Sequence, residues 1–179
     1  MNILFLILGI AVSVLMVFFV FAIYKLRSEN IVFFEKLCRN KQLGVIIGFP
    51  LICWCVPHAQ AIIFAWAESY LWYAAVVLTV LSYFYLDYLF ARALGGAFII
   101  GAYYFVHGAY EFQVPFAIML TVVSWLWGIA GIIISGKPSF LRDYFRKSAV
   151  DRKFRITSYV IFCITGAVFL CSSVAELLK

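Results

Sequence analysis

Charged residues are scarce in this chain of 179 residues, where Asp, Glu, Lys and Arg together make up 12%. A soluble globular domain carries about 25% charged and about 45–50% apolar residues. Here hydrophobic residues reach 66%, and a domain of this length cannot hide that much apolar surface from water, because its surface-to-volume ratio is too high. The composition therefore excludes an ordinary soluble domain and indicates that lipid is the solvent.

The sequence also lacks the short motifs that mark common catalytic sites. It contains no Walker loop, no H-E-x-x-H, no G-x-S-x-G and no dinucleotide-binding fingerprint. None of its five cysteines lies in a gap expected to face outward, so a disulfide framework is not expected. These absences favour a protein that is not an enzyme and whose cysteines are small buried hydrophobes. The cysteines are Cys38, Cys53, Cys55, Cys163 and Cys171.

Long apolar runs are what the sequence has in abundance. Six of them are long enough to cross a bilayer core of ~30 Å, which takes ~20 helical residues. They are continuously apolar rather than alternating, which favours helices over the strands of a β-barrel. The first run lacks a basic segment before it, so we expect it to be retained as a span rather than removed as a signal peptide. The prediction is a single all-α integral membrane domain over residues 1–179, with spans at 2–25, 43–67, 69–91, 94–111, 114–135 and 156–177.

Basic residues are confined to three of the five gaps between these runs. Thirteen of the fourteen Lys and Arg residues lie there, and the other two gaps contain Glu68 and Glu111 but no basic residue. Basic residues near span ends stay on the cytoplasmic side. Alternation of six spans then predicts three out–in–out hairpins in an inner (plasma) membrane, with the N-terminus and the C-terminus both outside. The basic gaps hold Lys25, Arg27, Lys36, Arg39 and Lys41, then Arg92, then Lys137, Arg142, Arg146, Lys147, Arg152, Lys153 and Arg155.

The two longer basic gaps carry apolar residues at helical spacing. This pattern predicts short amphipathic helices lying in the cytoplasmic interface, where the basic residues between them would attract anionic lipid headgroups. Topology explains these charges, so nucleic-acid binding is not expected. The apolar sets are Ile31, Phe34, Leu37 and Cys38, and Phe140, Leu141, Tyr144, Phe145 and Phe154.

The second run is the most irregular, because Pro50 and Pro57 lie inside it. Each proline removes a backbone donor and clashes with the preceding turn, and interrupted spans often line substrate or ion sites. His58 follows directly, and His107 lies at a similar depth in the fourth run. Together with Tyr103 and Tyr104, these residues predict a cavity between the second and fourth spans; ordinary packing is the alternative.

The two histidines also permit a different interpretation. Two imidazoles at one level could be the axial ligands of a haem. With Cys55, one turn before His58, they could instead hold zinc or copper. The sequence names no cofactor beyond these possibilities.

Asp87 is the one acidic residue well inside a predicted span, near the inner end of the third. Arg92 follows five residues later, and we expect the two to form a structural charge pair at the interface. A proton or cation relay is the alternative. An intramembrane enzyme using this pair against lipid headgroups would lack a convincing nucleophile.

The function predicted from these patterns is a small transporter, or the substrate-binding membrane subunit of a transport complex. Two other classes stay open. One is a haem- or metal-binding redox subunit that uses His58 and His107. The other is a structural or assembly subunit of a membrane complex that has no small-molecule site.

Overall fold

The described part of the chain is entirely helical. A computed structural model describes residues 3–26, 30–114 and 116–177, and these ranges contain eight α-helices, one 3₁₀ turn and no strand. The helices are α1 (Ile3–Lys25), α2 (Ile31–Cys38), α3 (Lys41–Gln60), α4 (Glu68–Tyr85), α5 (Leu89–Glu111), α6 (Ala117–Gly136), α7 (Ser139–Val150) and α8 (Arg152–Leu177), with the 3₁₀ turn η2 (Ala65–Ala67) before α4.

Five of these helices are long and apolar enough to cross a membrane, namely α1, α3, α5, α6 and α8. The predicted third span at 69–91 corresponds to α4, which is shorter and is not among the five. The prediction placed its inner boundary wrongly. Leu86 is extended and Tyr88 adopts a left-handed conformation with φ 57°, so the chain breaks there and α5 begins at Leu89. Asp87 therefore lies in this break, and Arg92 lies on α5.

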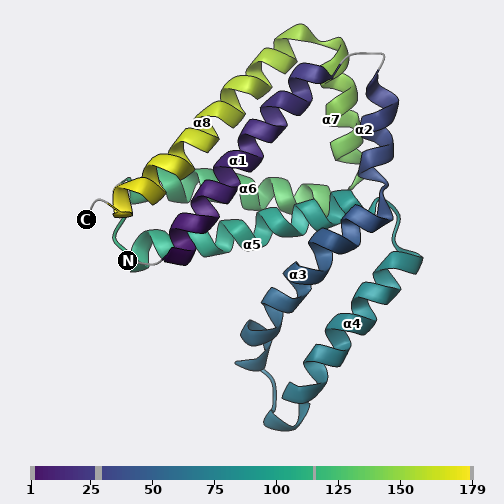
Figure 1. Cartoon of the computed structure of the whole chain (residues 1–179), viewed down its shortest axis with the longest axis vertical. Coiled ribbons are helices and arrows are strands. Elements are labelled where there is room, and N and C mark those ends of the chain that lie inside the picture. The colour runs from purple at the N-terminus through teal and green to yellow at the C-terminus, as the bar shows by residue number, and fades with distance from the viewer. Residues whose placement is uncertain (1–2, 27–29, 115, 178–179) are drawn as a thin grey trace.

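Four helices form a packed bundle. α5 lies along α6, and α1 lies along α8, whereas α3 packs on α5 and α4 packs on α3 with little contact to α5. Figure 1 shows the consequence: α3 and α4 form a hairpin that leans away from the bundle of α1, α5, α6 and α8. The start of α1 and the end of α8 lie at the same end of the molecule as the turn between α5 and α6 (Figure 1).

Aromatic side chains fill the bundle, and glycine lets its helices touch. Phe105 and Phe169 are almost fully buried, with ring centroids 4.6 Å apart. Trp127 packs on Phe169 at 5.0 Å. A Cβ atom at Gly95 or at Gly131 would collide with the facing helix, so α5 and α6 approach as closely as their backbones allow.

The two predicted amphipathic segments form helices α2 and α7, and these helices pack on each other. Phe34 and Phe145 are both buried, with ring centroids 5.4 Å apart. Glu35 pairs with Arg146 across the same contact. The apolar face of each helix is therefore covered partly by the other helix. Residues Phe34, Cys38, Leu141, Phe145 and Ser148 make up the buried faces.

Candidate functional site

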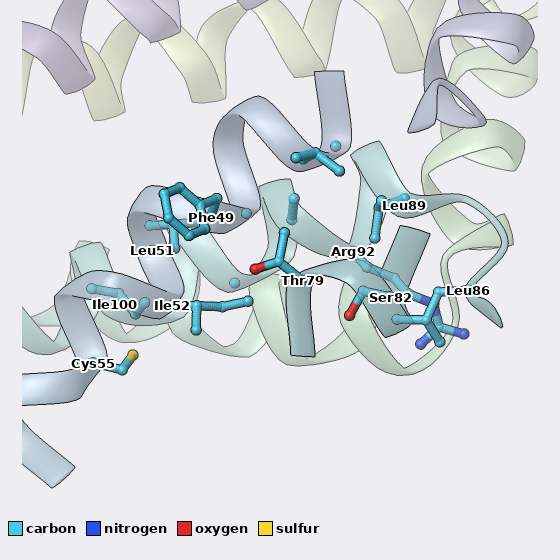
Figure 2. A pocket seen from close by; sticks show the side chains of 15 residues that line it. Phe49, Leu51, Ile52, Cys55, Thr79, Ser82, Leu86, Leu89, Arg92 and Ile100 are labelled. Atoms are coloured by element: carbon cyan, nitrogen blue, oxygen red, sulfur yellow. The ribbon is translucent and has the colours of Figure 1, made fainter. Parts of the chain in front are cut away.

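An apolar groove runs between α3, α4 and α5 and encloses about 240 Å³. It lies between the two helices that the sequence predicts to border a cavity. Figure 2 shows the side chains of α3, α4 and α5 around this space. The lining residues are Gly44, Val45, Gly48, Phe49, Leu51, Ile52 and Cys55 from α3, Thr79 and Ser82 from α4, Leu86 from the break, and Leu89, Arg92, Ala93, Gly96 and Ile100 from α5.

Glycines and the position of α4 together create the groove. At Gly44, α3 touches α5 so closely that a Cβ would collide with Leu89. Further along, a Cβ at Gly48 would reach only ordinary contact with Ala93, and one at Gly96 would meet nothing within 4 Å. The two helices are therefore joined at one end of the groove, and the space farther along is left unfilled. Since α4 packs on α3 and hardly on α5, it does not fill that space.

Few polar groups face the groove. The Thr79 hydroxyl donates to the carbonyl oxygen of Ala75 at 2.8 Å, so it is already satisfied within α4. Ser82 and Cys55 add one hydroxyl and one thiol. Arg92 is the one residue of the lining that carries a full charge. The groove therefore offers mostly hydrocarbon contact, with a cation at one place.

Arg92 is held by main-chain oxygens. Its Nη1 donates to the carbonyl oxygen of Ser135 on α6 at 2.8 Å, and its Nε donates to the carbonyl oxygen of Asp87 at 3.3 Å. The Ser135 hydroxyl donates back to the carbonyl oxygen of Arg92 at 3.4 Å. No ion pair joins the Asp87 carboxylate to Arg92 in the described part of the chain. The charge pair expected from the sequence is therefore a contact between a guanidinium and the backbone of Asp87.

The sequence predicts that Pro50 and Pro57 interrupt the second span, but the helix continues through both of them. α3 runs as one helix from Lys41 to Gln60 through both prolines, and both rings are exposed on its surface. Each still removes a backbone donor, which frees the carbonyl groups one turn earlier. Neither proline lines the groove, so their proposed role in ligand contact stays a prediction.

His58 on α3 and His107 on α5 both lie next to Tyr103. The ring centroids of His58 and Tyr103 are 6.1 Å apart with the planes nearly perpendicular. Tyr103 and His107 stack at 6.1 Å with an angle of 4° between their planes. His107 also lies 3.7 Å from a carboxylate oxygen of Glu111, one turn further along α5. The two histidines, which the sequence places at a similar depth, thus lie beside the same residue, Tyr103. All three rings lie beyond the groove and are not part of its lining.

Tyr104 points in another direction. It packs against Trp54 of α3, with ring centroids 6.3 Å apart, and against Phe5 of α1 at the same distance. It therefore belongs to the contact between α3, α5 and α1. Of the six cavity residues predicted from the sequence, none is among the residues that line the groove.

The predicted metal ligands are only partly brought together. Cys55 lines the groove, whereas His58 and His107 flank Tyr103. Within the described residues, no three His, Cys, Asp or Glu side chains converge as a metal site would require. This geometry does not favour Cys55 as a shared ligand with the two histidines.

Comparison with known proteins gives no further guide to the site. No protein-family model, no curated protein and no solved structure matches the chain.

Sequence reasoning missed the residues that line the groove most directly, above all Gly96, Thr79 and Ser82. Gly44 and Gly48 carried a usable signal, because a G-x-x-x-G pattern marks a close helix contact. The pair Gly95–Gly96 carried another, since one of two adjacent glycines faces α6 and the other faces the groove.

Proposed function

We propose that this chain is a six-span protein of the inner (plasma) membrane that holds a small, mostly apolar ligand in the groove between α3, α4 and α5. It would act as a small transporter or as the substrate-binding membrane subunit of a transport complex. α4 is the sixth span, and both termini lie on the outer side. The observation that carries the proposal is a lateral apolar groove with a single cation in its lining.

The charge distribution supports this topology. Most of the basic residues lie on α2, on α7 and at the beginnings of α3, α5 and α8. Along the chain these basic segments alternate with the segments between α3 and α4 and between α5 and α6, which contain no Lys or Arg. The beginning of α1 and the end of α8 lie together at the opposite end of the molecule (Figure 1). Retention of basic segments on the cytoplasmic side then orients all six helices.

The groove supports a binding role because of its shape and composition. Ligand sites are concave and mostly apolar with a few placed polar groups, and they typically measure about 300–1,000 Å³. This groove, at about 240 Å³, lies just below that range, which suits a slender ligand. A ligand could also enter the groove past α4, because among the described helices α4 packs closely on α3 alone.

The sharpest test fills the groove without disturbing the fold. In Gly96→Leu the new side chain enters the groove, where nothing lies within 4 Å of the Cβ position. Gly101→Leu is the matched control, because Gly101 lies on the same helix, also has open space at its Cβ, and does not line the groove. We expect Gly96→Leu to abolish ligand binding or uptake in reconstituted vesicles, and Gly101→Leu to preserve it. Equal activity of both variants would refute the proposed site.

The histidines provide a second measurement in the same assay. If the rings beside Tyr103 form part of the ligand path, His58→Ala and His107→Ala will each abolish uptake while the protein still accumulates in the membrane. If either variant transports normally, that residue has no part in the path, and the groove alone carries the function.

A further inference from the structure

The position of Arg92 narrows the kind of ligand that the groove can take. Arg92 is half-buried and lies at the end of the groove where α3 and α5 meet, beside Leu86 and Leu89 (Figure 2). A guanidinium has five N–H donors, and two of them are used by the carbonyl oxygens of Ser135 and Asp87. Within the described residues the other three have no protein partner. A charge placed against an apolar groove with open donors suits an anionic group.

Two further features make this end of the groove electropositive. α5 begins here without a side-chain cap, whereas at the start of α3 the Leu43 N–H already donates to Asn40 Oδ1 at 3.1 Å. The uncapped N–H groups at the start of α5 favour negative charge. Lys41, one turn before Gly44, lies with its ammonium group 5.7 Å from the ring centroid of Tyr83 on α4. The Asp87 carboxylate lies in the same break but forms no ion pair with Arg92 among the described residues. The positive charge of Arg92 is thus left for a ligand.

The rest of the groove suits a hydrocarbon chain. From Leu89 towards Ile100 and Cys55 its lining is almost entirely apolar. A narrow space of about 240 Å³ accommodates one chain better than a bulky ring system. The groove is partly open to the outside, and α4, which hardly touches α5, does not close it. If the spans cross a bilayer as proposed, this opening faces lipid.

We infer that the ligand is an anionic lipid of the inner leaflet, with its phosphate at Arg92 and one acyl chain along α3 and α5. This inference rests on the proposed function, because it assigns a ligand class to the same groove. The basic residue would hold the headgroup at the level of the interface, and the groove would take a chain directly from the surrounding bilayer.

The test measures which lipids the purified full-length chain retains. Protein in detergent is mixed with equal amounts of phosphatidylglycerol and phosphatidylcholine that carry identical acyl chains, and native mass spectrometry counts the bound molecules of each. The wild-type protein should retain the anionic lipid preferentially. Arg92→Gln should lower this preference roughly fivefold, which is the effect of one basic residue on an anionic headgroup, and Arg92→Lys should keep most of it.

Arg152→Gln is the control for unspecific attraction, because Arg152 is exposed at the start of α8 and does not line the groove. The inference is overturned if Arg92→Gln and Arg152→Gln lower the preference equally, or if the wild-type protein retains both lipids equally. Gly96→Leu separates this failure from that of the proposed function. If it removes a ligand that Arg92→Gln leaves in place, the groove binds a neutral ligand and only the lipid assignment fails. If Gly96→Leu also changes nothing, the groove is not the site.

Discussion

The bundle and the α3–α4 hairpin are both apolar, yet they bury very different shares of their residues. α5 buries ten residues, whereas α3 and α4 bury two each. In the bundle, Phe105, Phe169 and Trp127 interlock between helices that meet through glycine. In the hairpin, most large side chains point outward. The groove lies on the border between these two regions.

In lipid this difference has a particular meaning. An exposed apolar side chain costs little there, because lipid tails are as apolar as leucine, so helices associate through close packing rather than through hydrophobic burial. The bundle has such packing, and the hairpin has it mainly where Gly44 meets Leu89. Regions with few buried contacts open at a lower free-energy cost. We therefore expect the hairpin to be the part that moves when a ligand enters the groove.

The largest effect should follow from removing an interlocked ring in the bundle. Phe105 is 1% exposed, and Phe84 on α4 is 68% exposed. Phe105→Ala should lower the free energy of unfolding by about 3 kcal/mol, the lower end for such a change, because lipid also solvates the lost contacts. Phe84→Ala should change it little. Denaturation of the purified protein in detergent measures both, and equal losses would remove the contrast between bundle and hairpin.

Thiol reactivity compares the contact between α2 and α7 with the α3–α4 hairpin without altering their packing. Burial at α2 raises the pKa of Cys38 to about 11 from a usual value of 9.0, whereas Cys55 is exposed at the groove. Two pKa units correspond to about 100-fold less thiolate at neutral pH. In variants that keep only one cysteine, Cys38 should react with a small maleimide at least 100-fold more slowly than an ordinary thiol, and its rate should rise with pH up to about pH 11.

The sign of this pKa shift also bears on stability. The folded state binds the Cys38 proton more tightly than the unfolded state, so the resulting stabilisation is complete below pH 9 and is lost as the pH rises towards 11.

Cys55 should react readily in detergent and more slowly when a ligand fills the groove. A Cys38 that reacts as fast as Cys55 would show that α2 and α7 do not form a stable contact.

Sequence patterns predict this fold well where one physical rule dominates. Five of the six apolar runs correspond to helices that are long and apolar enough to cross a membrane, and the run at 69–91 corresponds to α4, which is not one of them. The helical spacing of apolar residues around Phe34 and around Phe145 predicts two amphipathic helices, because periodicity decides which face is apolar. The boundary near Asp87 could not be predicted, since the break depends on a left-handed Tyr88, a conformation that a tyrosine seldom adopts.

The site was harder to predict than the fold, for a physical reason. Polar residues in an apolar run attract attention, so the sequence points to His58, Tyr103 and His107, and the structure does place these rings together. A groove, however, forms where residues without a large side chain leave space between helices. Gly48 and Gly96 leave space only because α4 does not fill it, and the relative position of three helices cannot be read from any one of them.

The smallest effect concerns how α2 and α7 are held together. A hydrogen bond from Arg146 lowers the pKa of Glu35 below its usual 4.5, and both side chains are partly exposed, where ion pairs contribute little. Glu35→Gln should therefore lower the melting temperature only slightly at neutral pH, because the Phe34–Phe145 contact remains. Since the folded state holds the Glu35 carboxylate in its charged form, the stabilisation is present above pH 4.5 and disappears as the pH falls through the lowered pKa.

The difference in melting temperature between the wild-type protein and Glu35→Gln should therefore decrease as the pH falls below 4.5 and vanish in acid. Glu68→Gln, at the start of α4, serves as the control, because Glu68 forms no ion pair in the described residues. It measures how far the loss of one exposed carboxylate that pairs with no cation changes the melting temperature at neutral pH. A large loss in Glu35→Gln at neutral pH would instead mean that charge, and not the aromatic contact, joins α2 to α7.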